Sequence, residues 1–447
     1  MKKPINFYCI ALMVLTVFSI SVINTGYGLA WEVPENVPGD FDGKWYGIHC
    51  PDVPKKEIVG LVDGEEAFPS QTIIDSWGYK AKPIDEIKDL LPKIYFNMCS
   101  HPEDWGDIRI NETAYIPIDK WPGEHRKLMA EATKKNLGTA RLDEKGHISN
   151  YKNGVPFPGS TNGLEIAWNF VYSRISADEL LNRFYIAVVD KTGHTRYMVG
   201  EVANLAWKGR LHGEDVPNLE PNPKNYESFF SVGFRSPYDM KGLVTATHRY
   251  DCAHKEDDQW LFLPQIRRVR RMSTAQRWDK CPGGVDITYD GTLGFSGKPT
   301  NYEWKYLGRK TLLCSHNGKA QLQEIKGKPG GAICDQWYQR VDCIMLEYAP
   351  KIPAPISKAI MYIDPELYSC YYVEFYDTRG RPYLFYAHAY VVSTDGYTGP
   401  CGFFVSDVQR IHSSHNYGYE VSLDAKARDI KPEFFQMSAL QRRFPSR

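Results

Sequence analysis

The sequence lacks the short motifs that mark most catalytic and cofactor-binding sites. It contains no nucleophile elbow, phosphate-binding loop, HExxH metal motif or dinucleotide-binding glycine fingerprint. No C-x-x-C pair is present, which argues against a zinc ribbon or a thioredoxin-like redox site. An enzyme is therefore less favoured than a binding protein or an interaction protein. We assign no catalytic residue, cofactor or metal.

Net charge is also absent, because 54 Lys and Arg balance 54 Asp and Glu. Proteins that bind nucleic acid usually carry a strong positive field, so no nucleic-acid partner is expected. Beyond the N-terminal region, no second apolar run is long enough to cross a membrane. The mature protein is expected to be soluble.

Residues 1–30 have the pattern of a secretory signal. Lys2 and Lys3 form the basic end, an apolar core follows over 10–23, and Gly28-Leu29-Ala30 places small residues at the cleavage site. Cleavage would leave Trp31 first and deliver the protein to the periplasm. An uncleaved membrane anchor is the alternative, since the apolar run approaches spanning length.

Cysteine is infrequent, and nine remain after the signal region. Exported proteins retain disulfides, so structural bridges are the expected use of these residues. Cys50 with Cys99, and Cys252 with Cys281, are tentative pairs, because spacing does not determine connectivity. The odd count predicts at least one free thiol.

Hydrophobic periodicity predicts a mainly β chain with few helices. Helical spacing is seen near 84–91 and 122–135, and Asn162 is expected to cap a helix over 164–172. Alternating or continuous apolar patterns predict strands at 184–190, 196–207, 228–235, 243–250, 260–263, 303–313, 337–348, 358–363, 370–376, 383–392 and 403–410. Because helices do not alternate with these strands, we expect an antiparallel curved sheet.

Two segments between the strands are interpreted as a mobile loop and a turn. Residues 281–300 are rich in glycine and predict a long, mobile loop. Asp257 and Asp258 are adjacent on an extended chain, so their side chains face opposite ways and cannot easily form a catalytic pair. A solvated turn is the expected setting for both.

A family resemblance appears at WLFLPQIRRVRRMS, from Trp260 to Ser273. This strand pair resembles the LolA/LolB-like lipoprotein-carrier superfamily and, more narrowly, the bacterial domain-of-unknown-function 1329 family. Four further segments are similar in order: ATKKNLGTARL, GVPFPGSTNGLEIAWN, PYDMKGLVTATHRY and KAIMYIDPELYSCYYVEFYDTRGRPYLF. The resemblance implies a curved antiparallel half-barrel covered by helices over 156–447, preceded by an irregular extension over 31–155.

Four aromatic residues are candidates for lining an acyl-chain cavity in such a half-barrel: Trp168, Tyr238, Trp260 and Phe262. The cavity reading depends on the resemblance, because aromatic residues in strands are more often part of an ordinary core. Trp260 and Phe262 should share one face of their strand, with Leu261 and Leu263 on the other.

Four arginines follow that strand within five positions: Arg267, Arg268, Arg270 and Arg271. Guanidinium groups bind phosphate and carboxylate through paired hydrogen bonds, so the cluster is a candidate site for anionic head groups or for a partner. The alternative is structural pairing with acidic residues such as Glu303 on a neighbouring strand.

Two histidine clusters are candidates for metal sites. His248, Cys252 and His254 lie close in sequence, as do His412 and His415. Neither cluster has an evident third and fourth ligand, so ordinary polar roles are expected.

The favoured function is a periplasmic binding or carrier protein for a lipid or another hydrophobic molecule. The resemblance implies a partner among exporters of the resistance-nodulation-division type or outer-membrane proteins. The alternative is an envelope assembly or interaction protein that docks on an outer-membrane partner without a soluble ligand. An open apolar cavity would favour the carrier, and a packed interior with an exposed apolar patch would favour docking.

Overall fold

The computed structural model describes residues 48–49, 72–73, 82–106, 108, 110–112, 115, 118–120, 123–173, 177–252, 255–273, 276–316, 336–393, 398–422 and 430–446. All of these belong to one compact unit within Glu35–Arg447. Among the helices of these residues, none has the length and apolar character needed to cross a membrane.

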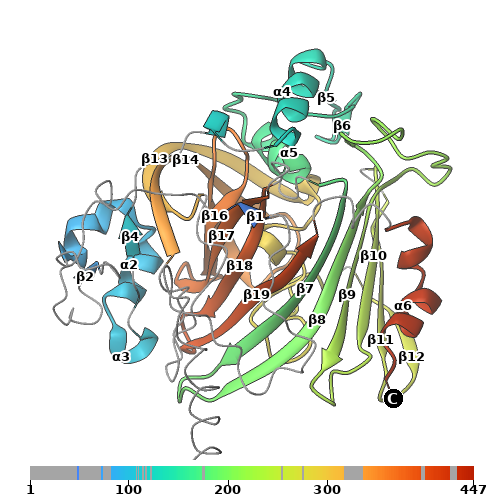
Figure 1. Ribbon diagram of the computed structural model, residues 1–447. Helices are drawn as coiled ribbons and strands as arrows, with labels where there is room; N and C mark the ends of the chain where they lie inside the picture. Colours follow the sequence, from blue (N-terminus) through green and yellow to red (C-terminus); the bar gives the residue numbers. More distant parts are fainter. Residues whose placement is uncertain are drawn as a thin grey trace, which may run out of the picture. The chain divides into compact units, whose positions relative to one another are not determined.

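One large, curved antiparallel sheet dominates the structure (Figure 1). Its main strands are β7 (Glu179–Val189), β8 (Thr195–Ala206), β9 (Tyr226–Ser236), β10 (Val244–Tyr250), β11 (Asp258–Leu263), β12 (Arg268–Arg271), β13 (Tyr302–Cys314), β14 (Gln336–Pro350), β15 (Ile356–Ile363), β16 (Cys370–Asp377), β17 (Pro382–Ser393), β18 (Thr398–Asp407) and β19 (His412–Ser422). The predicted fold class is confirmed.

The strand order is β12-β11-β10-β9-β8-β7-β19-β18-β17-β16-β15-β14-β13. Two meanders therefore run in the same direction across the sheet, and they meet in its middle, where β19, the last strand of the second meander, pairs with β7, the first strand of the first. The first ends at one edge with β12, and the second starts at the other edge with β13. The chain between them must cross a face of the sheet.

The crossing chain is a segment of residues 276–301, which we call the interior segment. It contains two short 3-10 turns, η5 (Thr292–Gly294) and η6 (Pro299–Asn301). Val285, Ile287 and Phe295 of this segment are buried in the main core. The prediction of a mobile loop is therefore wrong. A chain that crosses the concave face can bury its apolar side chains there, despite its many glycines.

Asp286 anchors the interior segment to the centre of the sheet. Its carboxylate lies 2.6 Å from Nδ1 of His412 and accepts a hydrogen bond from the Ser414 hydroxyl at 3.1 Å. Lys280 donates to both Asp286 and Asp407, at 2.8 and 2.9 Å. These contacts explain why β19, which the sequence analysis missed, is polar and yet central: its Ser and His side chains bond the segment that lies over it.

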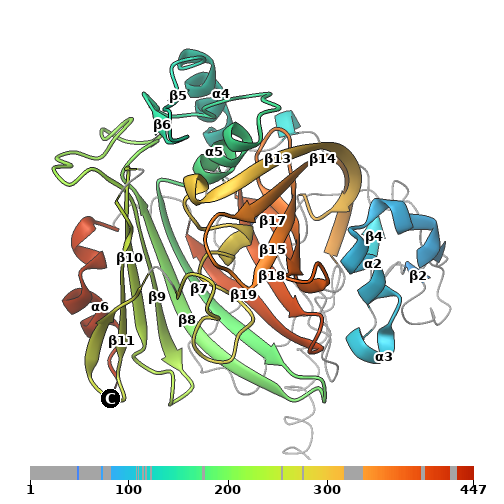
Figure 2. The ribbon, with the colours of Figure 1, turned by 180° about the vertical axis from the view of Figure 1, so that it is seen from behind.

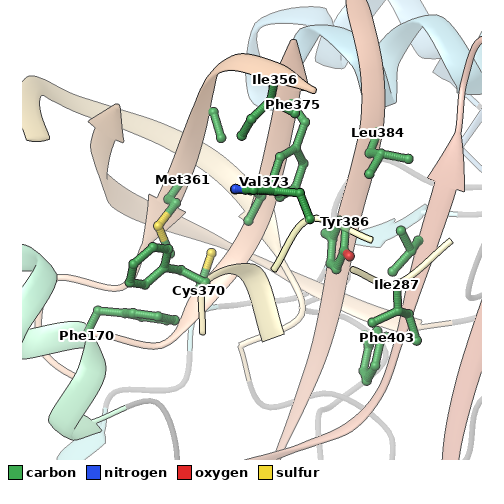
Figure 3. Close-up of a cluster of buried hydrophobic side chains, with 14 of the residues drawn as sticks. Phe170, Ile287, Ile356, Met361, Cys370, Val373, Phe375, Leu384, Tyr386 and Phe403 are labelled. Atoms are coloured by element: carbon green, nitrogen blue, oxygen red, sulfur yellow. The ribbon is translucent and has the colours of Figure 1, made fainter. Parts of the chain in front are cut away.

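The core fills the concave side of the sheet beneath the helix α5 (Gly163–Ser173). Figure 3 shows Phe170 of α5 facing side chains of β15, β16 and β17, among them Met361, Val373 and Tyr386. Asn162 caps α5 as predicted, because its Oδ1 accepts a hydrogen bond from the Leu164 backbone N–H at 3.0 Å.

A second layer covers the other face of β9, β10 and β11. It consists of η8 (Pro432–Phe435) and α6 (Met437–Arg443), and Figures 1 and 2 show α6 beside β10 and β11. Leu440 and Phe444 pack on Val244 and Ala246. A Cβ at Gly233 would lie only 2.3 Å from the Phe444 ring, so this position requires glycine for close packing.

The chain before residue 155 contributes to the same unit through several short elements: β1 (Ile48–His49), β2 (Thr72–Ile73), β3 (Lys82–Pro83), η2 (Ile84–Leu90), α2 (Lys93–Cys99), α3 (Pro102–Trp105), β4 (Ile110–Glu112), η3 (Ile118–Lys120), α4 (His125–Lys135), β5 (Arg141–Leu142) and β6 (Ile148–Ser149). β1 pairs with β17, and β4 pairs with β14 in parallel. Tyr95 of α2 stacks on Phe385 at 5.2 Å. The domain boundary at residue 155 stays a prediction.

The tentative disulfides are wrong for the cysteines that the structure describes. Cys99, Cys252 and Cys281 are free thiols, and so are Cys314, Cys343 and Cys370. Cys50 lies outside the described residues. Cys99 is fully buried at the end of α2, where a thiol packs as a small hydrophobic group. The expectation of at least one free thiol is confirmed.

Candidate ligand-binding site

A cavity of about 190 Å³ lies between the concave face of β7–β11 and the interior segment. A cavity that holds one water molecule needs a volume of roughly 10–15 Å³, so this cavity has room for a ligand much larger than a single water. Its main lining residues are Leu180, Asn182, Phe184, Val202, Asn204, Ser228, Phe230, Val232, Phe234, Thr245, Thr247, Arg249, Gln259, Cys281, Val285, Ile287, Tyr289, Leu293 and Phe403.

Strand periodicity places these side chains on one face. Successive side chains of a strand alternate between faces, so the strand lining comes mainly from even-numbered positions of β7, β8 and β9 and odd-numbered positions of β10 and β11. Ala246 and Trp260 also border the cavity. The strand register arranges them in rows across the sheet. Phe184 and Phe234 lie in the most apolar row, on either side of Gly200, and contact each other edge-to-face with centroids 6.0 Å apart.

Polarity rises along the strands away from that row. The next row contains Asn182, Val202, Val232 and Thr245, which are paired in that order across four strands. Farther along lie Asn204, Phe230, Thr247 and Gln259, and then Ser228 opposite Arg249. The cavity therefore has an apolar end and a polar end.

The opposite wall of the cavity is apolar and comes from the interior segment. Val285 and Ile287 line it, as does the half-buried Leu293. The Cys281 thiol also lines the cavity, and burial raises its pKa to about 12. This thiol stays protonated at neutral pH, so it contributes an apolar surface and not a nucleophile.

Arg249 is the charged residue of the lining, and its charge is compensated. Its Nε donates to Asp257 at 3.0 Å, and its Nη2 donates to the Ser296 carbonyl. Lys298 approaches the same Asp257 at 3.5 Å. Burial acts to lower the pKa of Arg249, but Asp257 and Glu227 outweigh it, so the pKa is raised and the guanidinium stays charged.

The acids around Arg249 differ from what the sequence predicts. Asp257 is buried, with 4% of its side chain exposed, so a solvated turn is wrong for this residue. Asp258 faces the other way and pairs with Arg271 and Tyr250, as the alternation of side chains predicts. Burial raises the pKa of Glu227, which lies in the same region as Arg249. An approximately balanced charge network thus closes the polar end.

The four candidate aromatic residues are not brought together. Trp168 belongs to α5 and is buried in a separate cluster with Ile148 and Tyr151, where its indole N–H donates to the Gly146 carbonyl at 2.9 Å. Tyr238 is 92% exposed in the turn between β9 and β10. Phe262 packs under α6 on the opposite face of the sheet, and Trp260 packs there too while also bordering the cavity. Their role in lipid binding stays a prediction.

The four candidate arginines lie on or beside the edge strand β12, and all are exposed. Arg271 pairs with Asp258 of β11, while Glu303 lies on β13 at the other edge of the sheet. Within the described residues, Arg267, Arg268 and Arg270 form no ion pair. Tyr238, Ile266 and Val269 are exposed apolar residues of the same region. We call these three arginines and three apolar residues the basic edge.

The histidine clusters have structural contacts. His248 stacks on Phe229 with centroids 3.9 Å apart, and His412 lies against Asp286. Among the residues that the structure describes, no three His, Cys, Asp or Glu side chains gather as metal ligands. His254 lies outside these residues.

Most of the cavity lining was not predicted from the sequence. The alternation along β7–β10 was a usable signal, because it assigns Phe184, Val202 and Val232 to one face. It did not show which face is concave. The inward polar positions, such as Asn182 and Thr247, resemble solvent-facing residues in sequence, so periodicity alone assigns them wrongly.

Comparison with known proteins identifies the family. A family described as "Protein of unknown function (DUF1329)" matches residues 122–441. The chain belongs to the DUF1329 family. The match confirms the family recognised in the sequence, and it covers the strands that form the cavity and the interior segment.

A curated relative of this DUF1329 protein is the uncharacterized protein PA3922 of Pseudomonas aeruginosa, 24% identical over 355 residues, which cover 69% of this chain and 70% of the relative. Among solved structures, a domain from Vibrio parahaemolyticus named as an outer membrane lipoprotein-sorting protein is similar, with 17% identity and a TM-score of 0.46, covering 62% of this chain and 98% of that one. A DUF1329 protein from Desulfovibrio piger has 14% identity and a TM-score of 0.45, with coverages of 62% and 96%.

Proposed function

We propose that this DUF1329 protein binds a lipid or another hydrophobic molecule in the cavity between β7–β11 and the interior segment. It acts as a carrier in the periplasm, and its function involves no covalent chemistry. The observation that supports the proposal is a cavity with an apolar wall between the interior segment and β7–β11, the half of the sheet that ends with β12. Transfer of apolar surface from water supplies the binding energy, at roughly 25 cal/mol per Å² buried.

The periplasmic location follows from the signal-like pattern of residues 1–30, which lie outside the described residues. The resemblance recognised in the sequence supports work with an exporter of the resistance-nodulation-division type or with an outer-membrane protein. A carrier that transfers a ligand must dock on the component that donates or receives it, so the carrier and docking hypotheses are compatible.

The test uses 1-N-phenylnaphthylamine, a dye whose fluorescence rises in apolar sites. We expect the wild-type protein to bind the dye and Val232→Trp to bind it at least tenfold more weakly, because Val232 lies on the cavity floor. Leu137→Trp is the matched control, since Leu137 is 64% exposed and should leave binding unchanged. Thermal unfolding would verify that both variants fold.

Equal dye binding by Val232→Trp and the wild type would disprove the site. Native mass spectrometry of the protein purified from the periplasm provides a second measurement. A stoichiometric adduct of lipid mass that is lost on denaturation is the expected result. A bare polypeptide mass, combined with no dye binding, would favour the interaction protein.

The docking hypothesis has its own support in the basic edge. β12 ends the strand order, so one side of its backbone has no neighbouring strand among the described residues. Three arginines that form no ion pair in the described part of the chain lie beside exposed Tyr238, Ile266 and Val269, and they combine positive charge with apolar contacts. This combination is typical of surfaces that bind anionic membranes. We propose an anionic lipid surface as the docking partner of this edge.

A further inference from the structure

The floor of the cavity carries uncharged polar side chains in two groups. Asn182 and Asn204 belong to β7 and β8, and Thr245, Thr247 and Gln259 belong to β10 and β11. Such groups are unusual in a site that would hold only hydrocarbon, because a polar group buried without a hydrogen bond is costly. The Asn204 amide can bond the backbone of Leu205 and Phe229, which leaves four positions of this kind in one cavity. These four indicate that the ligand also has polar atoms.

The side chain of Asn182 has hydrogen-bonding capacity that the described residues do not use. Its amide lines the cavity, and its Oδ1 is buried without a hydrogen-bond partner among the described residues. Most buried amides in folded proteins are bonded to protein or to ordered water. A ligand with a donor group could satisfy this amide, whereas an alkyl chain could not.

An apolar strip separates the two polar groups. The register places Val202 and Val232 between Asn182 and Thr245, so the two polar positions are three strand spacings apart. Neighbouring strands lie about 4.8 Å apart, which makes this separation roughly 14 Å. The ligand that matches the floor has an apolar body and hydrogen-bonding groups that reach at least one side of this strip.

Free charge is not offered to the ligand. Arg249 is bonded to Asp257 and to the Ser296 carbonyl, and 6% of the residue is exposed. A carboxylate or phosphate that entered the cavity would lose its hydration without gaining an unpaired cation. A hydroxyl, carbonyl or amide loses less hydration and finds partners on the floor.

We infer that the ligand is a neutral amphiphile, with an apolar body and uncharged hydrogen-bonding groups, and not a fatty acid or a phospholipid head group. This inference rests on the proposed function, since it concerns the ligand of the same cavity. Alcohols, esters, ketones and amides of suitable size share this chemistry.

The experiment measures displacement of bound 1-N-phenylnaphthylamine by 1-decanol and by decanoate at pH 8, below the micelle-forming concentration. The two competitors share a ten-carbon skeleton and differ in the charge of the head group. We expect 1-decanol to displace the dye at a concentration at least tenfold lower. In the double variant Asn182→Leu/Thr247→Val, the affinity for decanol, corrected for any change in dye affinity, should fall about tenfold.

Asn97→Leu is the control, because Asn97 is exposed on α2 and lies outside the cavity lining. Failure of the wild type to bind the dye would overturn the proposed function itself. Dye binding with equal or stronger displacement by decanoate would overturn only the inference about the ligand. Unchanged decanol affinity in the double variant would also overturn it, by showing that the polar floor serves only bound water.

Discussion

At the scale of single residues, His388 shows how burial sets a pH limit on stability. The side chain lies on β17 in the core, 5.5 Å from the ring of Phe403, and burial lowers its pKa from 6.5 to about 4. The unfolded chain therefore binds a proton between these pH values that the folded chain does not bind. This contribution to stability is complete above about pH 6.5 and is lost as the pH falls toward 4.

We predict that His388→Phe loses less stability on acidification than the wild type. The difference between the two proteins in unfolding free energy should change by on the order of 3 kcal/mol from pH 7 to pH 4, because one pKa unit corresponds to about 1.36 kcal/mol. Urea unfolding across this pH range measures the difference. Parallel pH profiles for the two proteins would contradict the burial of a neutral His388.

Residue identity alone did not reveal the compensated charges of the site. Asp257 and Arg249 are separated by eight positions and pair only because β10 and β11 are antiparallel neighbours. The arginine run was visible in sequence, whereas the partner of each arginine was not. Arg271 pairs with Asp258 on the adjacent strand, whereas Glu303, the partner considered in the sequence, lies at the opposite edge of the sheet.

At the scale of elements, the interior segment differs most from its prediction, because it is part of the core and not a mobile loop. Glycine content predicted mobility, yet Phe295 is fully buried and contacts Tyr302, Trp304 and Tyr348 at centroid distances of 4.9 to 5.2 Å. The glycines permit turns, and the apolar residues between them occupy the core. This segment forms one wall of the cavity.

We predict that Phe295→Ala lowers the free energy of unfolding by roughly 3–5 kcal/mol, the usual cost of removing a buried aromatic ring. Asp279→Ala in the same segment is the control, because an exposed position should change stability by less than about 0.5 kcal/mol. Urea midpoints at constant slope give both values. If both substitutions had equally small effects on the free energy of unfolding, the prediction of a mobile loop would be correct after all.

At the scale of the molecule, the proposed carrier function and the position of the basic edge together predict that the ligand is collected at a membrane. The turns that follow β9 and β11 lie at the same end of the sheet, and Gln265 donates a hydrogen bond to the Asp239 carbonyl between them. Tyr238 and Arg267 belong to these two turns. The apolar row of the cavity, with Phe184 and Phe234, is the row nearest to that end of the strands.

We predict that the triple variant Arg267→Gln/Arg268→Gln/Arg270→Gln binds vesicles of phosphatidylglycerol and phosphatidylethanolamine about a hundredfold more weakly than the wild type. Each arginine near an anionic surface contributes roughly 1 kcal/mol. Sedimentation with vesicles at 0.1 M salt, a condition in which surface charges are screened beyond about 10 Å, gives the partition coefficient.

A variant that removes the same net charge elsewhere serves as the control for the vesicle experiment. Lys152, Lys305 and Arg379 are exposed, and their substitution by Gln should have a much smaller effect. If both triple variants lost the same amount of vesicle binding, the binding would depend on net charge and not on the basic edge. Absence of vesicle binding by the wild type would exclude the basic edge as a lipid-docking surface.

The sequence by itself determined the family, the antiparallel β class and most strand positions, because alternating side chains and turn residues act locally. It also determined which arginines are clustered and which face of β11 each side chain takes. Tertiary structure alone decided the strand order, the path of the interior segment and the position of the cavity. These depend on contacts between residues far apart in the chain, where a polar position such as Asn182 or Ser414 can be buried because another element supplies its surroundings.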